Sequence, residues 1–264
     1  MPTIHITDLN NPALEPYARL TERQLLSRLH PEEGLFICES MKVIRVALER
    51  GMQPVSFLCE EKFLECVNAL MCECGSDMPV YTAPREVLKG LTGYELSRGV
   101  LCAMQRPVLP PVDRVLDGAR RVVVLDSVVN SENTGAIFRA AAALGIDAVL
   151  LTRTCCDPLN RRACRVSMGT VFQLPWTYLD HYMQLKDCGF TTVAMALTDR
   201  SVSIGDPSLK GIDRMAIILG TEGDGLSDNV LRACDHVARI PMHRGVDSLN
   251  VAAAAAVAFY ELTR

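Results

Sequence analysis

The 264-residue sequence contains no apolar run that suits a membrane span and no Cys-x-x-Cys pair. Its most apolar stretch, Ser248–Leu262, is too short for a span and carries Asn250 and Glu261, so a packed core helix is expected there. The N-terminus lacks the basic and apolar regions of a signal peptide. The eleven cysteines form no quartet with zinc-like spacing, so no metal site is expected. These absences favour a reduced, cytoplasmic protein with mostly buried thiols.

The composition is that of an ordinary globular protein, with 49% apolar and 22% charged residues. A chain of this length forms one large domain or two smaller ones. The formal net charge is −4, which argues mildly against a nucleic-acid partner because such proteins are often basic. A net charge does not exclude a local basic patch, and one is present further along the chain.

Helical and strand-like stretches alternate throughout, which predicts an α/β protein. The segment Gln105–Val112 contains three prolines. Such a segment sustains neither a helix nor a central strand, so we interpret it as a semi-rigid linker. We therefore predict an N-terminal domain over residues 1–105, a linker over 106–119 and a C-terminal domain over 120–264.

Apolar patterns and cap residues place the individual elements. In the N-terminal part we expect helices over Pro12–Leu29, from the cap Ser40 to Gly51, over Glu61–Cys72 and over Pro84–Leu91, and strands over Leu35–Cys38, Val55–Cys59, Val80–Thr82 and Gly99–Met104. In the C-terminal part we expect strands over Arg121–Leu125, Ala148–Leu151, Thr191–Ala196, Met215–Leu219 and Val237–Ile240, and helices over Gly135–Leu144 and Ser248–Leu262. The near-continuous apolar runs predict a parallel sheet that is covered on both faces.

Residues suited to chemistry gather in three segments, each of which follows a predicted strand of the C-terminal part. Open α/β sheets bind ligands at that end of their strands. The first segment runs from Asp126 to Arg139 and includes Asn133 and Gly135. Arg139 projects above Gly135, one turn earlier, and the glycine leaves room for a ligand beside the guanidinium. A surface arginine on an amphipathic helix is the alternative interpretation.

The second segment, Gly220–Leu226, has three glycines in six residues, which allows a ligand to approach the backbone closely. It lacks the dinucleotide pattern and the P-loop ending, and Glu222 makes it a poor phosphate cradle. A tight connecting loop is the alternative. The third segment, Ile240-Pro-Met242 and then Ser248-Leu-Asn250-Val, offers side chains that either cap the terminal helix or face a ligand.

Together the segments resemble the signature motifs of the SpoU (TrmH-type) branch of the SPOUT RNA methyltransferases. The three patterns are Asn-x-Gly-x-x-x-Arg, Gly-x-Glu-x-x-Gly-Leu, and Ile-Pro-Met followed by Ser-Leu-Asn-Val, and they occur here in the family's order. The stretch Asp157–Gly169 between the first two is also typical of the family. More loosely, Phe36–Ser40 and Arg98–Met104 resemble the substrate-binding domain of many SpoU enzymes, which is similar to a small ribosomal protein.

This resemblance implies a deep trefoil knot at the C-terminus, an exception to the rule that chains avoid knots, and a homodimer packed through the knotted regions. It implies S-adenosyl-L-methionine as cofactor, held in loops of the knot. By motif position, the residues expected to hold it are Gly220, Ile240 and Leu249 through the backbone, and Leu219, Met242 and Ala196 along the pocket.

The implied reaction is methyl transfer to a ribose 2′-hydroxyl, which is barely ionised near neutral pH and needs a proton acceptor and in-line geometry. The family assigns the base to the arginine that matches Arg139. A guanidinium is normally protonated and has no acceptor, so Arg139 either binds the neighbouring phosphate and positions the hydroxyl or helps to deprotonate it. Asn133, Glu222, Ser248 and Asn250 are expected to orient it and the ribose.

An RNA partner needs positive charge, and the stretch from Arg153 to Arg165 has four arginines and one aspartate. Its planar guanidinium groups suit phosphate recognition. A solvated charged loop is the alternative. The residues expected to contact RNA are Arg153, Arg161, Arg162 and Arg165.

Three functions remain in competition at the level of sequence. The first is an RNA 2′-O-ribose methyltransferase, on ribosomal RNA because of the two-domain layout, or else on transfer RNA. The second is a non-catalytic RNA-binding assembly factor that kept the fold, which would tolerate loss of Arg139. The third is an ordinary nucleotide-cofactor enzyme, which predicts a glycine-rich turn after the first strand; Asp126–Asn133 contains none.

Overall fold

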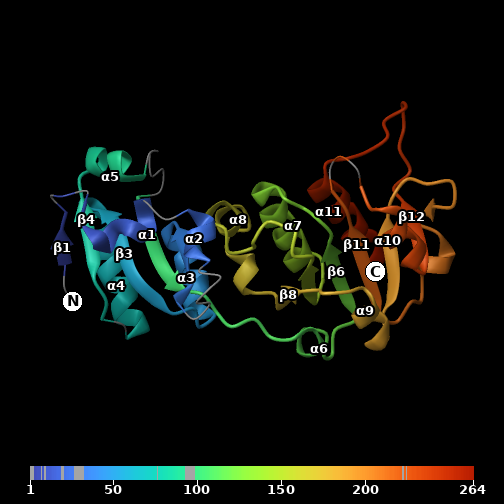
Figure 1. The fold of residues 1–264 in the computed structure, drawn as a ribbon, viewed down its shortest axis with the longest axis horizontal. Coiled ribbons are helices and arrows are strands. Elements are labelled where there is room, and N and C mark those ends of the chain that lie inside the picture. The colour runs from blue at the N-terminus through green and yellow to red at the C-terminus, as the bar shows by residue number, and fades with distance from the viewer. Residues whose placement is uncertain are drawn as a thin grey trace. The chain divides into compact units, whose positions relative to one another are not determined.

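The computed structural model describes residues 3–6, 8, 10–18, 21–26, 33–75, 77–92, 99–221, 223 and 225–264. Glu222, Arg98 and parts of the helix predicted over Pro12–Leu29 lie outside the described residues. The chain divides into two compact units (Figure 1). The first unit comprises Met1–Val108 and Leu159–Phe172, and the second comprises Leu109–Pro158 and Gln173–Arg264.

The first unit is built on a sheet with the strand order β1-β4-β3-β5-β2. Strand β5 runs antiparallel to both of its neighbours, and the other pairs are parallel. The strands are β1 (Thr3–His5), β2 (Leu35–Glu39), β3 (Pro54–Glu60), β4 (Val80–Ala83) and β5 (Val100–Gln105). The helices are α1 (Glu15–Ala18), α2 (Glu22–Leu25), α3 (Met41–Glu49), α4 (Leu64–Cys74), α5 (Arg85–Thr92) and α8 (Arg161–Val166).

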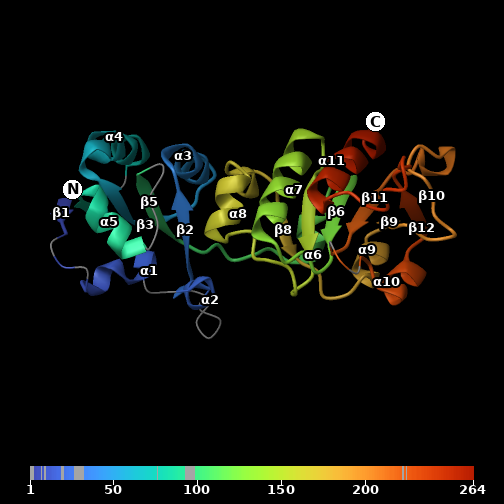
Figure 2. The ribbon, with the colours of Figure 1, turned by 90° about the horizontal axis from the view of Figure 1, so that it is seen from above.

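Helices cover both faces of this sheet, with α3 and α4 on one face and α1 and α5 on the other (Figure 2). The buried hydroxyl of Tyr17 on α1 lies 2.7 Å from the Ser56 carbonyl and accepts the Ala103 N–H at 3.2 Å. Because these partners belong to β3 and β5, the hydrogen bonds fix α1 across the central strands.

The single helix predicted over Pro12–Leu29 is wrong for the described residues, which form α1 and α2 as separate short helices. Thr21 caps α2: its hydroxyl accepts the Gln24 N–H, and the Gln24 side chain accepts the Thr21 N–H. A capping box starts a helix and requires non-helical backbone at the cap, so it breaks the helix that the apolar pattern alone predicts.

Ser40 precedes α3 as predicted, but its side chain makes no cap hydrogen bond. Its backbone has φ 85 and ψ 140, its side chain is buried, and its hydroxyl has no hydrogen-bond partner among the described residues. Gly51, the predicted C-cap, has φ +81, the left-handed conformation that a helix end requires.

We expect Ser40→Gly to stabilise the protein by about 1 kcal/mol. A non-glycine residue in this sparsely populated backbone conformation costs about 1–3 kcal/mol. Glycine also gives the unfolded chain more conformational entropy, which offsets about 0.4–1 kcal/mol of the gain. Thermal unfolding of the full chain measures the change. Gly51→Ala is the matched control: it imposes a side chain at φ +81 and should lower the melting temperature. A lower melting temperature in Ser40→Gly than in the wild type would show that the backbone at residue 40 is not strained.

The second unit is built on an all-parallel sheet with the order β10-β12-β9-β11-β6-β7-β8. The strands are β6 (Arg121–Leu125), β7 (Ala148–Leu151), β8 (Trp176–Tyr178), β9 (Thr191–Met195), β10 (Val202–Ser203), β11 (Met215–Leu219) and β12 (His236–Arg239). The helices are α6 (Val112–Val115), α7 (Ser131–Ala143), α9 (Met183–Asp187), α10 (Asp228–Ala233) and α11 (Val251–Leu262).

Within this unit, α7 and α11 cover one face of the sheet, and α6, α9 and α10 cover the other (Figure 2). Every residue of β11 is buried, as the uninterrupted apolar run predicts for a doubly covered strand. The prediction of a parallel α/β sheet in the C-terminal part is therefore confirmed. None of the described helices is long and apolar enough to cross a membrane.

The divisions of the chain differ from the predicted 1–105, 106–119 and 120–264. Val112, Val115 and Leu116, within the predicted linker, are buried in the core of the second unit. The segment 159–172, within the predicted C-terminal domain, belongs to the first unit. There Phe172 packs on Phe36 with ring centroids 5.7 Å apart. These placements depend on apolar contacts between segments distant in sequence, which a local proline count does not detect.

Candidate active site

The three segments singled out in the sequence follow β6, β11 and β12 in the structure. Their first residues are Asp126, Gly220 and Ile240. Strand β11 pairs in parallel with β6 and β9, and β9 pairs in parallel with β12. All three segments therefore leave the sheet at its carboxyl edge, where parallel α/β sheets bind ligands.

The first segment leads into α7 through a side-chain cap. The carboxamide oxygen of Asn130 accepts the N–H groups of Glu132 and Asn133 at 2.8 and 3.3 Å. The helix therefore starts at Ser131, earlier than the predicted Gly135. Asn133 lies in its first turn. Arg139 is exposed further along α7, and no described residue forms a hydrogen bond or ion pair with its guanidinium.

The third segment is joined to the first by a hydrogen bond. Asn250 caps α11, and its Oδ1 accepts the N–H groups of Ala252 and Ala253 at 3.0 and 3.3 Å. Its Nδ2 donates to Oδ1 of Asn133 at 3.1 Å. The capping role and the site role, which the sequence left as alternatives, are thus compatible in one side chain.

The second segment doubles back on itself. A Cβ on Gly220 would lie 2.5 Å from the Gly225 carbonyl carbon and 2.8 Å from the Leu226 nitrogen, so only glycine fits there. The Thr221 N–H donates to the Gly225 carbonyl at 3.2 Å and closes the loop. Glu222, the predicted carboxylate of this loop, lies outside the described residues.

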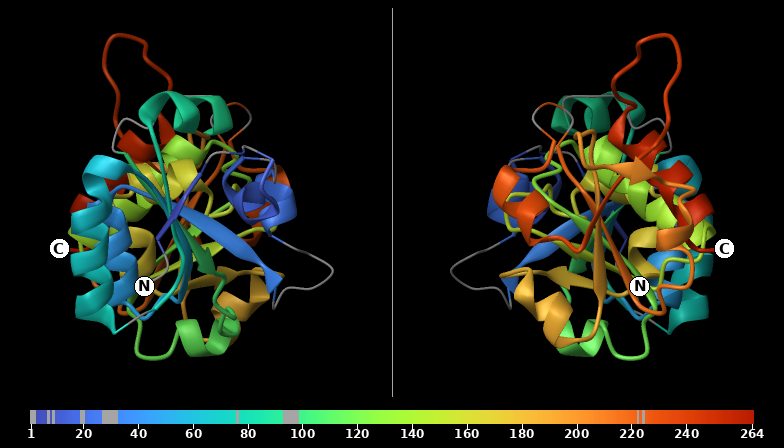
Figure 3. Two further views of the ribbon diagram at one scale, coloured as in Figure 1. Left: turned by 90° about the vertical axis from the view of Figure 1, so that its left-hand side faces the viewer. Right: turned by 90° about the vertical axis from the view of Figure 1, so that its right-hand side faces the viewer.

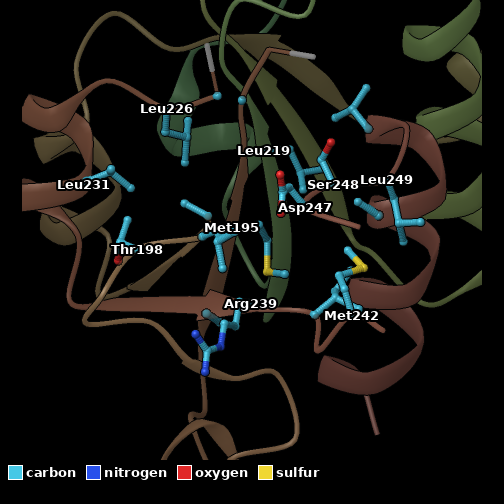
Figure 4. Close-up of a pocket in the computed structure, with 18 of the residues that line it drawn as sticks. Met195, Thr198, Leu219, Leu226, Leu231, Arg239, Met242, Asp247, Ser248 and Leu249 are labelled. Carbon is cyan, nitrogen blue, oxygen red and sulfur yellow. The ribbon is translucent and has the colours of Figure 1, made fainter. Parts of the chain in front are cut away.

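The second and third segments, with residues 195–198 at the end of β9, line a cavity of about 870 Å³ in the second unit (Figure 4). The first segment does not line it. All the residues predicted to hold a cofactor line it: Ala196, Leu219, Gly220, Ile240, Met242 and Leu249. Ser248, from the predicted catalytic set, also lines it, and the sequence did not single out Met195, Asp228, Leu231 or Asp247. Figure 4 shows Leu231 and Thr198 on one side and Ser248 and Leu249 on the other.

A hydrogen-bonded network at the base of the first segment was also missed from the sequence. The Asp126 carboxylate accepts the Tyr182 hydroxyl at 2.8 Å and the Ser127 hydroxyl at 3.0 Å. Burial, followed by the hydrogen bond to Asp126, raises the pKa of Tyr182. Ser127 has φ +58, and its N–H donates to the Thr152 hydroxyl at 2.9 Å. The network fixes the turn from which α7, and hence Asn133 and Arg139, departs.

The predicted RNA-binding arginines do not form one exposed group. Arg153 pairs with Asp180 at 2.9 Å and lies over the Tyr178 ring. Arg165 pairs at 3.2 Å with Glu39, whose side chain is only 3% exposed. The acidic partners come from distant segments, so the charge count between 153 and 165 overstates the positive charge available to RNA.

Of the other two arginines in this stretch, Arg162 is exposed. Arg161 is half-buried, and burial lowers the pKa of its guanidinium, against the opposing charges of Glu39 and Glu22. The first unit holds both residues on α8.

An all-parallel α/β sheet with a cavity at its carboxyl edge, lined by the segments that follow β9, β11 and β12, defines a ligand-binding α/β domain of the open-sheet class. Comparison with known sequences gives the family: residues 120–260 match the model of the SpoU rRNA methylase family. The chain belongs to this family of RNA methyltransferases.

Two curated relatives extend the match beyond this domain. An uncharacterised tRNA/rRNA methyltransferase of Mycobacterium tuberculosis is 38% identical over 98% of this chain and 91% of its own length. The 23S rRNA (guanosine-2′-O-)-methyltransferase RlmB of Bordetella pertussis is 31% identical over 70% of this chain and 78% of its own. Among solved structures, an AdoMet-bound rRNA methyltransferase of Sinorhizobium meliloti is 25% identical, with a TM-score of 0.81 over 98% of this chain and 97% of that one.

Proposed function

We propose that this protein is an S-adenosylmethionine-dependent RNA 2′-O-ribose methyltransferase that acts on large-subunit ribosomal RNA. The observation that carries the proposal is the convergence of the second and third motif segments on one cavity, together with the hydrogen bond by which Asn250 joins the first segment at Asn133. That cavity lies at the carboxyl edge of the sheet and is lined by every residue expected to hold the cofactor.

The cavity suits S-adenosylmethionine in size and chemistry. Its volume of about 870 Å³ is within the range of small-molecule sites, about 300–1,000 Å³. Apolar side chains such as Leu219 and Leu226 suit the adenine ring, and backbone from the Gly220 loop suits its polar edge. Asp228 and Asp247 also line the cavity, and their carboxylates favour a cationic ligand. When bound, S-adenosylmethionine supplies an electrophilic methyl group on a sulfonium.

The chain must then bind the ribose and raise the nucleophilicity of its 2′-hydroxyl. We assign Arg139 to the phosphate beside the target ribose, where its fork also orients the hydroxyl. The Asn133–Asn250 pair and Ser248 orient the ribose through hydrogen bonds. Glu222 is the carboxylate of this set, and it either fixes the arginine or accepts the hydroxyl proton.

Ribosomal RNA is the proposed substrate because RlmB, whose name specifies 23S rRNA and guanosine 2′-O-methylation, matches 70% of this chain. Transfer RNA is the alternative, supported by the tRNA/rRNA name of the mycobacterial relative. A non-catalytic assembly factor is the third possibility. It is disfavoured because Arg139, Asn133, Ser248 and Asn250 are all present.

We further infer that the first unit is the RNA substrate-binding domain and that the C-terminal loops form a trefoil knot. Both follow from the family resemblance. We also infer a homodimer through the second unit. Supporting this, the alanine-rich helix α11 exposes the side chains of Val257 and Tyr260, an arrangement suited to the self-complementary contact of a symmetric pair.

We expect the purified protein to transfer labelled methyl groups from S-adenosylmethionine to large ribosomal RNA. The test uses total RNA from a host that lacks this gene, with ribosomal and transfer RNA separated after the reaction. Label in transfer RNA alone would show that ribosomal RNA is not the substrate, and it would leave the proposed methyl transfer unchanged. Failure to bind S-adenosylmethionine at all would favour the non-catalytic alternative.

A further inference from the structure

The loop that joins β12 to α11 has two chemically different parts. Its flanks line the cavity through Pro241, Met242, Val246, Asp247, Ser248 and Leu249. Its tip carries two exposed basic residues, His243 and Arg244, which do not line the cavity. Figures 1 and 3 show this loop, in red, rising beyond the strands and helices of its unit.

The tip is a defined turn. The Val246 N–H donates to the His243 carbonyl at 3.2 Å, and Arg244 and Gly245 have φ +58 and +69. A non-glycine residue in the left-handed region is uncommon and normally needs a surrounding constraint. Arg244 lies in this turn and does not line the cavity that the rest of the loop lines.

The positive charge at the tip is not neutralised within the described part of the chain. No described residue forms an ion pair or hydrogen bond with the side chain of His243 or Arg244. The acidic residue of the same loop, Asp247, lines the cavity instead. An exposed guanidinium without a partner among the described residues, on a loop that also lines a ligand cavity, suits an anionic ligand that approaches that cavity.

We propose that Arg244, with His243 beside it, contacts a backbone phosphate of the RNA strand near the target nucleotide. This inference rests on the proposed function, because in-line transfer requires the ribose to reach the mouth of the methyl-donor cavity. One short loop supplies both the cavity wall and the basic tip, so a strand placed at the mouth meets the tip. Phosphate contacts position an RNA without reading its sequence.

The same loop couples the two ligands. The flanks that line the cavity also carry the tip, so a ligand that contacts the flanks restricts where the tip lies. RNA should therefore bind more tightly when S-adenosylhomocysteine is present, by about fivefold or more, and S-adenosylhomocysteine should bind more tightly with RNA by the same factor. Arg244→Gln should remove most of this coupling and leave S-adenosylhomocysteine affinity without RNA unchanged.

The test measures binding of a fluorescent single-stranded oligouridine RNA across a salt series, with S-adenosylhomocysteine present. Arg244→Gln should weaken binding about tenfold and reduce the slope of log Kd against log salt by about 0.7, the loss of one phosphate contact on a single strand. Arg120→Gln, which precedes β6 at the opposite edge of the sheet, is the matched control and should change neither.

A slope equal to that of the wild type in Arg244→Gln would overturn the contact, even if the wild type methylates RNA. Conversely, a reduced slope in a protein that neither binds S-adenosylmethionine nor transfers methyl groups would refute the proposed function and leave the phosphate contact standing. Thermal unfolding of both variants verifies that they fold.

Discussion

Arg139→Ala is expected to lower kcat for methyl transfer to RNA about a thousandfold and to leave the affinity for S-adenosylmethionine unchanged. The side chain is exposed on α7 and does not line the cavity. Its loss therefore removes the group that orients the hydroxyl without disturbing the cofactor site. A positioned group that assists proton transfer contributes about 10²–10⁴ in rate.

Two further variants define what Arg139 does. Arg139→Lys keeps the charge and loses the planar fork, so it should restore RNA affinity more than kcat. Arg232→Ala removes another exposed arginine of the same unit, on α10, and should leave kcat within about twofold. Single-turnover rates at saturating RNA separate these effects. An Arg139→Ala protein that retains most of its rate would exclude the arginine from the reaction and favour an RNA-binding role for the family motif.

Gly220→Ala is expected to weaken the binding of S-adenosylmethionine about a hundredfold. The added methyl group would lie 2.5 Å from the Gly225 carbonyl carbon and 2.6 Å from its oxygen. Backbone atoms cannot move out of the way by a rotamer change, as a flexible side chain can. The loop must therefore open, and the part of the cavity lining that it forms must move. A displacement of about 1 Å at a site of this kind costs about a hundredfold in activity.

The matched control lies in the same loop. A Cβ on Gly223 meets no atom of the described residues within 4 Å, so Gly223→Ala should bind S-adenosylmethionine within about threefold of the wild type. Calorimetric titration with S-adenosylmethionine and S-adenosylhomocysteine measures both variants. Equal affinities for the two variants would show that close packing of this loop is not what shapes the cavity.

The buried strands were the most predictable part of the fold. Arg121–Leu125, Ala148–Leu151 and Met215–Leu219 are found with the predicted bounds, because an apolar run buried on both faces ends where the strand leaves the core. The start of α7 was missed because the Asn130 side chain sets it, four residues before the predicted Gly135.

In the site, the sequence predicted which segments are involved better than it predicted the side-chain interactions between distant residues. All six residues predicted to hold the cofactor line the cavity, since each lies in or beside a loop that a parallel sheet brings to one edge. The Tyr182–Asp126 hydrogen bond and the Arg165–Glu39 ion pair join residues 56 and 126 positions apart. No local pattern encodes such pairs, so the network beneath α7 and the neutralised arginines emerged from the structure alone.

In the proposed reaction, the methyl group goes to a ribose 2′-oxygen. The most direct test hydrolyses the labelled RNA product with alkali and separates the fragments by size. A 2′-O-methyl group blocks attack of that oxygen on the adjacent phosphate, so the account predicts that the label appears in an alkali-stable dinucleotide. Label released in mononucleotides would place the methyl group on a base and contradict the account.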